Sequence, residues 1–105
     1  MTRSRLDLLL QYYRDEPGDP FNLYGLALEY LKSDVEKSRE FFELLLNNHE
    51  EYVPSYYHAA RLYQDLNERE KALETYKKGI TIARKKGDMK ALRELQSAYD
   101  ELMYE

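Results

Sequence analysis

The fold is decided by residues 53–86, which read VPSYYHAARLYQDLNEREKALETYKKGITIARKK. Apolar residues recur in this stretch at intervals of three and four, the spacing that places side chains on one face of a helix. One such set ends at Tyr63 and the next begins at Ala72. Between them lies Asn67, a residue type that tolerates the left-handed backbone found just after helices. The stretch therefore predicts two amphipathic helices joined by a tight turn.

The same arrangement occurs one period earlier in the chain. At a shift of 33 residues, the matching pairs are Leu23 with Tyr56, Leu26 with Ala59, Ala27 with Ala60 and Tyr30 with Tyr63. At a shift of 34 residues, they are Ser38 with Ala72, Phe42 with Tyr76 and Leu45 with Gly79. Helix pairs of this kind cannot bury their apolar faces alone, so consecutive pairs stack. Since a glycine inside a helix costs about 1 kcal/mol relative to alanine, we expect Gly79 to lie at a close helix contact.

A 34-residue period with these residue types resembles the tetratricopeptide repeat, whose pattern reads W-x-x-L-G-x-x-Y, then A-x-x-x-F-x-x-A, then P. The chain departs from that pattern because it has no Trp and carries Ser38 and Gln96 where small residues are usual. The resemblance implies an all-α fold of about six helices, in which antiparallel hairpins stack as a right-handed α-solenoid. It also implies a single domain over 1–105, made of a half repeat (4–17), a first repeat (20–52), a second repeat (53–86) and a terminal capping helix (88–104).

Helix boundary signals agree with six helices. Ser4 with Asp7 has the form of a capping box and opens a helix at 4–15. Asp19 followed by Pro20 starts a second helix, which we expect to end near Ser33. The remaining expected signals are N-caps at Asp34 and Asp88, a helix start at Pro54, and a stop at Gly87 after a helix that runs to Lys86.

Composition narrows the function classes. With only four Val and Ile among 105 residues, the chain is poorly supplied for a sheet, which also favours an all-α fold. The absence of Cys excludes disulfides, thiolate nucleophiles and Cys-ligated metals. The net charge of -4 argues against a nucleic-acid partner, and no apolar run is long enough to span a membrane. We therefore expect a cytoplasmic protein with no cofactor and no membrane partner.

The resemblance also implies a binding surface, because the first helix of each repeat forms the concave wall of such arrays. The residues expected to line this partner-binding groove are Tyr24, Leu28, Lys32, Tyr57, His58, Arg61, Asp65, Lys90 and Arg93. Tyr and Arg are enriched among residues that dominate binding energy, so an unknown protein or peptide held by aromatic and Arg contacts is the expected partner. In an alternative interpretation, Tyr24 and Leu28 pack against the first helix and close the groove.

Other candidate sites are weak. His49 and His58 are the only imidazoles, their spacing fits no metal motif, and we expect both to be exposed. No nucleophile and base pattern is present, so neither a catalytic nor a metal site is predicted and the protein is not expected to be an enzyme. The basic residues that end the 53–86 stretch are interpreted as cations at a helix C-terminus. The alternative function is homo-oligomerisation through exposed residues at the end of the last helix, Leu102, Met103 and Tyr104.

Overall fold

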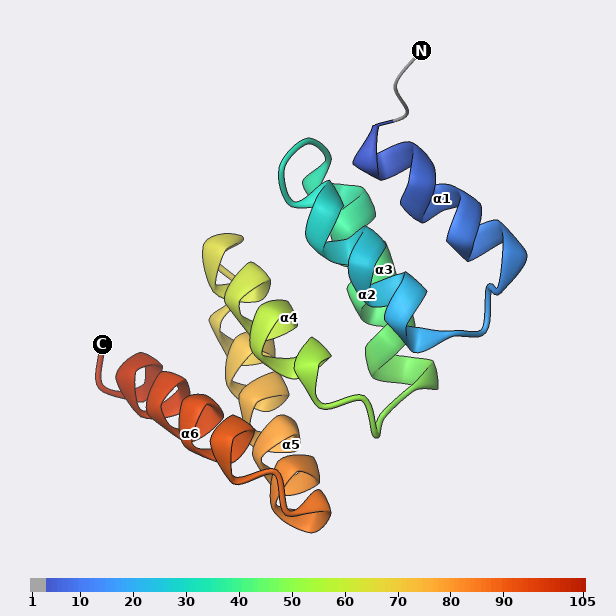
Figure 1. The fold of residues 1–105 in the computed structure, drawn as a ribbon. Coiled ribbons are helices and arrows are strands. Elements are labelled where there is room, and N and C mark those ends of the chain that lie inside the picture. Colours follow the sequence, from blue (N-terminus) through green and yellow to red (C-terminus); the bar gives the residue numbers. More distant parts are fainter. Residues whose placement is uncertain (1–3) are drawn as a thin grey trace. The chain divides into compact units, whose positions relative to one another are not determined.

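The computed structural model describes residues 4–105, and every regular element in that range is an α-helix (Figure 1). The helices are α1 (Arg5–Asp15), α2 (Pro20–Tyr30), α3 (Val35–Asn48), α4 (Pro54–Asp65), α5 (Arg69–Lys86) and α6 (Met89–Met103). The predicted all-α class and the predicted six helices are therefore confirmed for the described residues. These residues form two compact units, one ending at His49 and the other beginning at Glu50.

In the first unit, α2 packs antiparallel against α3, and α1 packs on α2. The core consists of fully or nearly fully buried side chains: Leu23, Leu26, Ala27, Tyr30, Phe42 and Leu45. Phe41 lies at the edge of this core, where it stacks on Tyr30 and meets Tyr13 edge-on at a ring distance of 5.5 Å. Tyr13 is consequently half-buried.

A buried serine links the two helices of this first hairpin. The Ser38 hydroxyl donates a 2.6 Å hydrogen bond to the main-chain carbonyl of Ala27, and neither residue is exposed. That carbonyl lies near the end of α2. The Leu31 amide, which would be its partner in a regular helix, donates to the carbonyl of Leu28. Carbonyls in the last turn of a helix lack a partner within the helix. The family pattern has a small apolar residue at position 38. A serine is present here because its hydroxyl supplies a hydrogen bond to the buried Ala27 carbonyl.

Local capping follows the sequence closely. The Ser4 and Asp7 capping box is present, and the side chains of Asp19, Asp34 and Asp88 each accept a main-chain hydrogen bond at a helix start. Gly87 adopts the left-handed conformation at φ 72° and ends α5. The expected end of the second helix near Ser33 is wrong, because α2 stops at Tyr30 and a turn occupies 31–33.

In the second unit, α5 packs against both α4 and α6. The helices approach closely at Gly79, where an added Cβ would lie 2.6 Å from the Cβ of Tyr56 in α4 and 3.2 Å from a methyl of Leu95 in α6. Carbon atoms in proteins pack at about 3.5–4.0 Å, so no side chain fits at residue 79. Gly25, in α2, has only one such neighbour, the terminal methyl of Leu9 at 3.0 Å.

These two glycines give a paired stability prediction. Gly79→Ala should lower the free energy of unfolding by about 1–2 kcal/mol, because the overlap with Tyr56 exceeds the roughly 1 kcal/mol that alanine contributes to helix propensity. Gly25→Ala is the matched control and should leave stability unchanged or slightly higher, since the Leu9 methyl can rotate away. Thermal unfolding followed by circular dichroism measures both. Equal midpoints for Gly79→Ala and the wild type would contradict the packing argument.

Candidate functional site

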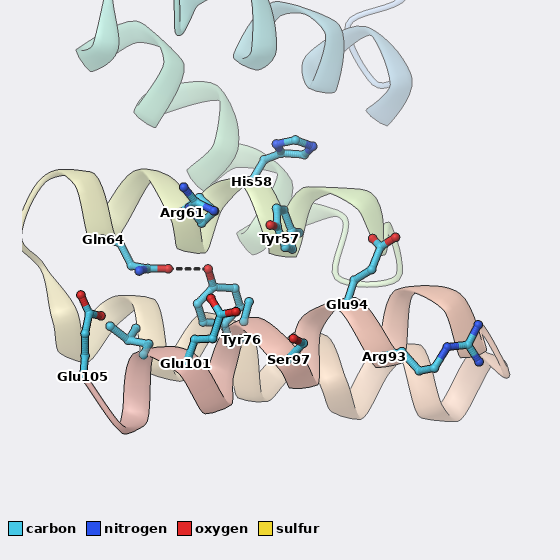
Figure 2. A pocket seen from close by; sticks show the side chains of 12 residues that line it. Tyr57, His58, Arg61, Gln64, Tyr76, Arg93, Glu94, Ser97, Glu101 and Glu105 are labelled. Carbon is cyan, nitrogen blue, oxygen red and sulfur yellow. Dashed lines mark hydrogen bonds between the residues drawn. The ribbon is translucent and has the colours of Figure 1, made fainter.

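The second unit carries a groove with a volume of about 890 Å³, formed by side chains of α4, α5 and α6 (Figure 2). It is lined by Tyr57, His58, Arg61, Gln64, Tyr76, Arg93, Glu94, Ser97, Ala98, Glu101, Leu102 and Glu105. The rings and the guanidinium of Arg61 come from α4 and α5, whereas every carboxylate of the groove comes from α6 or follows it directly. The groove thus has two chemically different walls.

Tyr76 forms the floor of the groove. Its side chain is buried, and its hydroxyl donates a hydrogen bond to Oε1 of Gln64, drawn as the dashed line in Figure 2. Burial raises the pKa of the Tyr76 phenol to about 12, with smaller contributions from the charges of Arg61, which opposes the shift, and of Asp65 and Glu101. The phenol therefore stays protonated at neutral pH and serves as a hydrogen-bond donor.

Tyr57 and Arg61 form the wall contributed by α4. The Tyr57 ring lies 6.4 Å from the Tyr76 ring at an interplanar angle of 66°, a favourable edge-on geometry. A side-chain hydrogen bond between Arg61 and Tyr57 raises the pKa of the guanidinium above its usual value. One turn of helix separates the two residues, which is the spacing that lets side chains meet on a helix surface. Arg61 is exposed and Tyr57 is half-exposed, so both can reach a ligand.

His58 lies at one edge of the groove, where its ring meets the Tyr57 ring edge-on at 5.6 Å. Burial lowers the pKa of its imidazole below 6.5, the charge of Arg61 lowers it further, and the charge of Glu94 raises it. His58 is therefore neutral at pH 7. Both His58 and His49 are half-buried, so the expectation that they are exposed is wrong.

The opposite wall is the face of α6 that carries Glu94, Ser97 and Glu101, followed by Glu105. Asp88 fixes the start of this helix by capping the Ala91 amide, and the buried Leu95 and Leu102 hold it against the rest of the unit. Glu94, Ser97 and Glu101 are three and four residues apart, so their side chains share one face of α6. Figure 2 shows Glu94 and Glu101 rising from α6 toward α4.

The groove brings together four of the residues expected from the sequence, Tyr57, His58, Arg61 and Arg93. Asp65 and Lys90 are exposed and lie outside its lining. Tyr24, Leu28 and Lys32 belong to the first unit. There, Tyr24 and Leu28 are half-buried and Lys32 pairs with Glu29 at 3.2 Å.

The lining residues that sequence reasoning missed include Gln64, Tyr76, Glu94, Glu101 and Glu105. The repeat matched Tyr76 only to Phe42, and its hydroxyl reaches the groove although its ring is buried. A signal for Glu94 and Glu101 was present, since each directly precedes a leucine of the buried α6 stripe, Leu95 and Leu102. The sequence does not tell which side of these leucines faces α4. Only the packing of the helices determines it.

Comparison with known proteins decides the family. The sequence profile of the tetratricopeptide repeat matches residues 53–86. The solution structure of a tetratricopeptide repeat domain protein from Salinibacter ruber is similar to this chain with a TM-score of 0.79 and 41% identity. The similarity covers 83% of this chain and 89% of that one. The chain belongs to the tetratricopeptide repeat family.

Two more solved structures are similar to this tetratricopeptide repeat protein. A crystal structure of a tetratricopeptide repeat domain protein from Salinibacter ruber gives a TM-score of 0.78 and 40% identity over 81% of this chain and 97% of that chain. The solution structure of a protein from Bordetella parapertussis gives a TM-score of 0.81 over 98% of this chain and 90% of that one. At 15% identity, the latter shows the fold alone. A search of the curated proteins found no match.

The predicted family and the helical-repeat fold of tetratricopeptide repeat proteins are thus confirmed. The repeat boundaries and the single domain stay predictions. Within residues 4–105, no helix combines the length and the apolar character that crossing a bilayer requires.

The electrostatics of the groove predict a measurable pH dependence. Since the folded-state pKa of His58 lies below its unfolded value of 6.5, the folded chain binds fewer protons than the unfolded chain in that window. The contribution of His58 to stability is therefore complete above pH 6.5 and is lost as the pH falls toward and through the folded pKa. An NMR titration of the His58 ring should give a midpoint below 6.5.

Two neutralising variants supply opposite controls for this titration. Arg61→Gln should raise the His58 midpoint because it removes a repelling cation, and Glu94→Gln should lower it because it removes an attracting anion. A wild-type midpoint at or above 6.5, or shifts of the same sign in the two variants, would contradict the assigned causes.

Proposed function

We propose that this tetratricopeptide repeat protein is a non-catalytic interaction module that binds a peptide segment of a partner protein in the groove of its second unit. Domains of this family generally act as protein-protein interaction modules. The observation that carries the proposal is the combination of Tyr57 and Arg61 on one wall of an open groove of about 890 Å³. The partner's identity and the cytoplasmic location stay predictions.

The chemistry of the groove supports recognition. Tyr offers a large rigid surface with a polar end, and Arg offers several donors, which is why both are enriched at binding hot spots. The hydrogen bonds of Arg61 with Tyr57 and of Tyr76 with Gln64 hold these groups in place before a ligand arrives. Ordering them beforehand reduces the entropy lost on binding.

A non-catalytic role also fits the acid-base properties of the groove. With its pKa raised to about 12, Tyr76 is a poor base at neutral pH, and the elevated pKa of Arg61 keeps that side chain charged. General bases act best when their pKa lies near the working pH. We therefore infer that these groups hold a ligand and do not transform it. Tyr24, Leu28 and Lys32 on α2 stay predicted partner contacts.

A selection experiment tests the proposal. A phage-displayed random peptide library is panned on the full chain, and the enriched peptides are synthesised and titrated by fluorescence anisotropy. The double variant Tyr57→Ala, Arg61→Ala should lower their affinity at least about tenfold, as expected when a hot spot is truncated. The matched double variant Tyr104→Ala, Arg84→Ala changes the same residue types at exposed positions outside the groove and should have no effect. Peptides that bind both double variants equally well would refute the groove as the binding site.

The second candidate function is homo-oligomerisation, and exposed apolar residues on the last helix favour it. Met103 and Tyr104, neighbours at the end of α6, have exposed fractions of 44% and 89%. Exposed apolar groups that cluster on one surface often mark interaction sites. Leu102, which the sequence offered for this role together with Met103 and Tyr104, is instead buried at 5% exposure.

Oligomerisation predicts a mass above the 12.6 kDa of one chain, and that mass should rise with protein concentration. Size-exclusion chromatography with light scattering measures it, and Met103→Glu with Tyr104→Glu should restore the single-chain mass. A constant mass of one chain at millimolar concentration would eliminate this function.

A further inference from the structure

The α6 wall of the groove carries negative charge that the protein does not neutralise. Glu94, Glu101 and Glu105 are exposed and line the groove. Among residues 4–105, none of the three forms an ion pair or a side-chain hydrogen bond. By contrast, Glu50 of the same unit lies outside the groove and pairs with Lys78 at 3.1 Å.

The two cations of the groove, Arg61 and Arg93, offset this charge only in part. Arg61, on the α4 wall, keeps its positive charge while its side chain hydrogen-bonds to Tyr57. Arg93 lies at one end of the lining, and Figure 2 shows its guanidinium directed along α6, away from Tyr57 and Tyr76. His58 adds no charge at neutral pH. The lining therefore carries three carboxylates against two guanidinium groups, which leaves an excess of negative charge.

We propose that the partner segment inserts a cationic side chain, lysine or arginine, between the α6 carboxylates and the Tyr57 ring. This inference rests on the proposed function and specifies the chemistry of its ligand. The carboxylates would supply ion pairs, and the exposed part of the Tyr57 ring would supply a cation–π contact. The hydroxyl of Ser97, which lies between Glu94 and Glu101 in the sequence, is an acceptor within the same wall.

An acidic segment fits this groove less well. Its carboxylates would meet Arg61 on one wall but three glutamates on the other, and like charges brought together at an interface are strongly unfavourable. The cations at the end of α5, Arg84, Lys85 and Lys86, do not change this balance, because none of them lines the groove. At physiological salt, charges beyond about 8 Å are largely screened. The local glutamates therefore determine the selectivity.

The test uses the peptides selected on the full chain as probes. Each peptide is synthesised as selected and with its Lys or Arg residues replaced one at a time by Gln and by Glu. For one such position we expect about tenfold weaker binding with Gln and a larger loss with Glu. Raising the salt concentration should weaken the selected peptide more than its Gln version.

Protein variants identify the carboxylates. Glu94→Gln with Glu101→Gln should weaken binding of the selected peptide about tenfold and should remove most of the difference between its Lys and Gln versions. Glu74→Gln, an exposed glutamate of α5 outside the groove, is the control and should leave both affinities unchanged. Circular dichroism checks that every variant is folded.

The possible outcomes separate the two claims. Cationic peptides that depend on Tyr57, Glu94 and Glu101 support the inference. Peptides that depend on Tyr57 and Arg61 but are acidic, or that bind the glutamate variants unchanged, would overturn the inference and leave the proposed function standing. If no selected peptide depends on any residue of the groove, both claims are refuted.

Discussion

The approach of α5 to its two neighbours at Gly79 is the constraint on which the groove depends. A side chain at this position would overlap with Tyr56, so the helices of the second unit can adopt their observed spacing only because residue 79 has none. Tyr57 follows Tyr56 in α4, and Tyr76 lies one turn before Gly79 in α5. The close contact therefore also sets the register that brings these two tyrosine rings within 6.4 Å of each other.

Most of the fold could be predicted from the sequence because local signals and the repeat pointed to the same helices. The capping residues Ser4, Asp19, Asp34 and Asp88 act at the helix starts where the sequence placed them. The end of α2 was harder to predict, since residues 31–33 carry no Gly or Pro and the turn forms from main-chain hydrogen bonds alone. Ser38 was recognised as a departure from the family pattern, but its reason required the position of the Ala27 carbonyl.

The candidate site was only partly predictable, and the two walls show why. On α4, repeat position alone identified Tyr57 and Arg61, because the family places the corresponding residues on an open face. On α6, the same reasoning selected Lys90 and Arg93, whereas the wall consists mainly of glutamates nearer the buried leucines. The difference arises from the rotation of α6 about its own axis, which depends on how Leu95 and Leu102 pack. Because of that packing, the wall is mainly negative, whereas Lys90 and Arg93 predicted a positive one.

Leu45 and Gly79 occupy matching positions of the two sequence copies, yet one is a fully buried leucine and the other tolerates no side chain at all. The two repeats therefore place their large and small side chains at different positions. For this reason one repeat cannot replace the other. A chimera that placed α3 after α4 would put four extra carbon atoms where not even a methyl group fits. In this chain, lengthening the array by duplicating a segment would require each new boundary to be repacked.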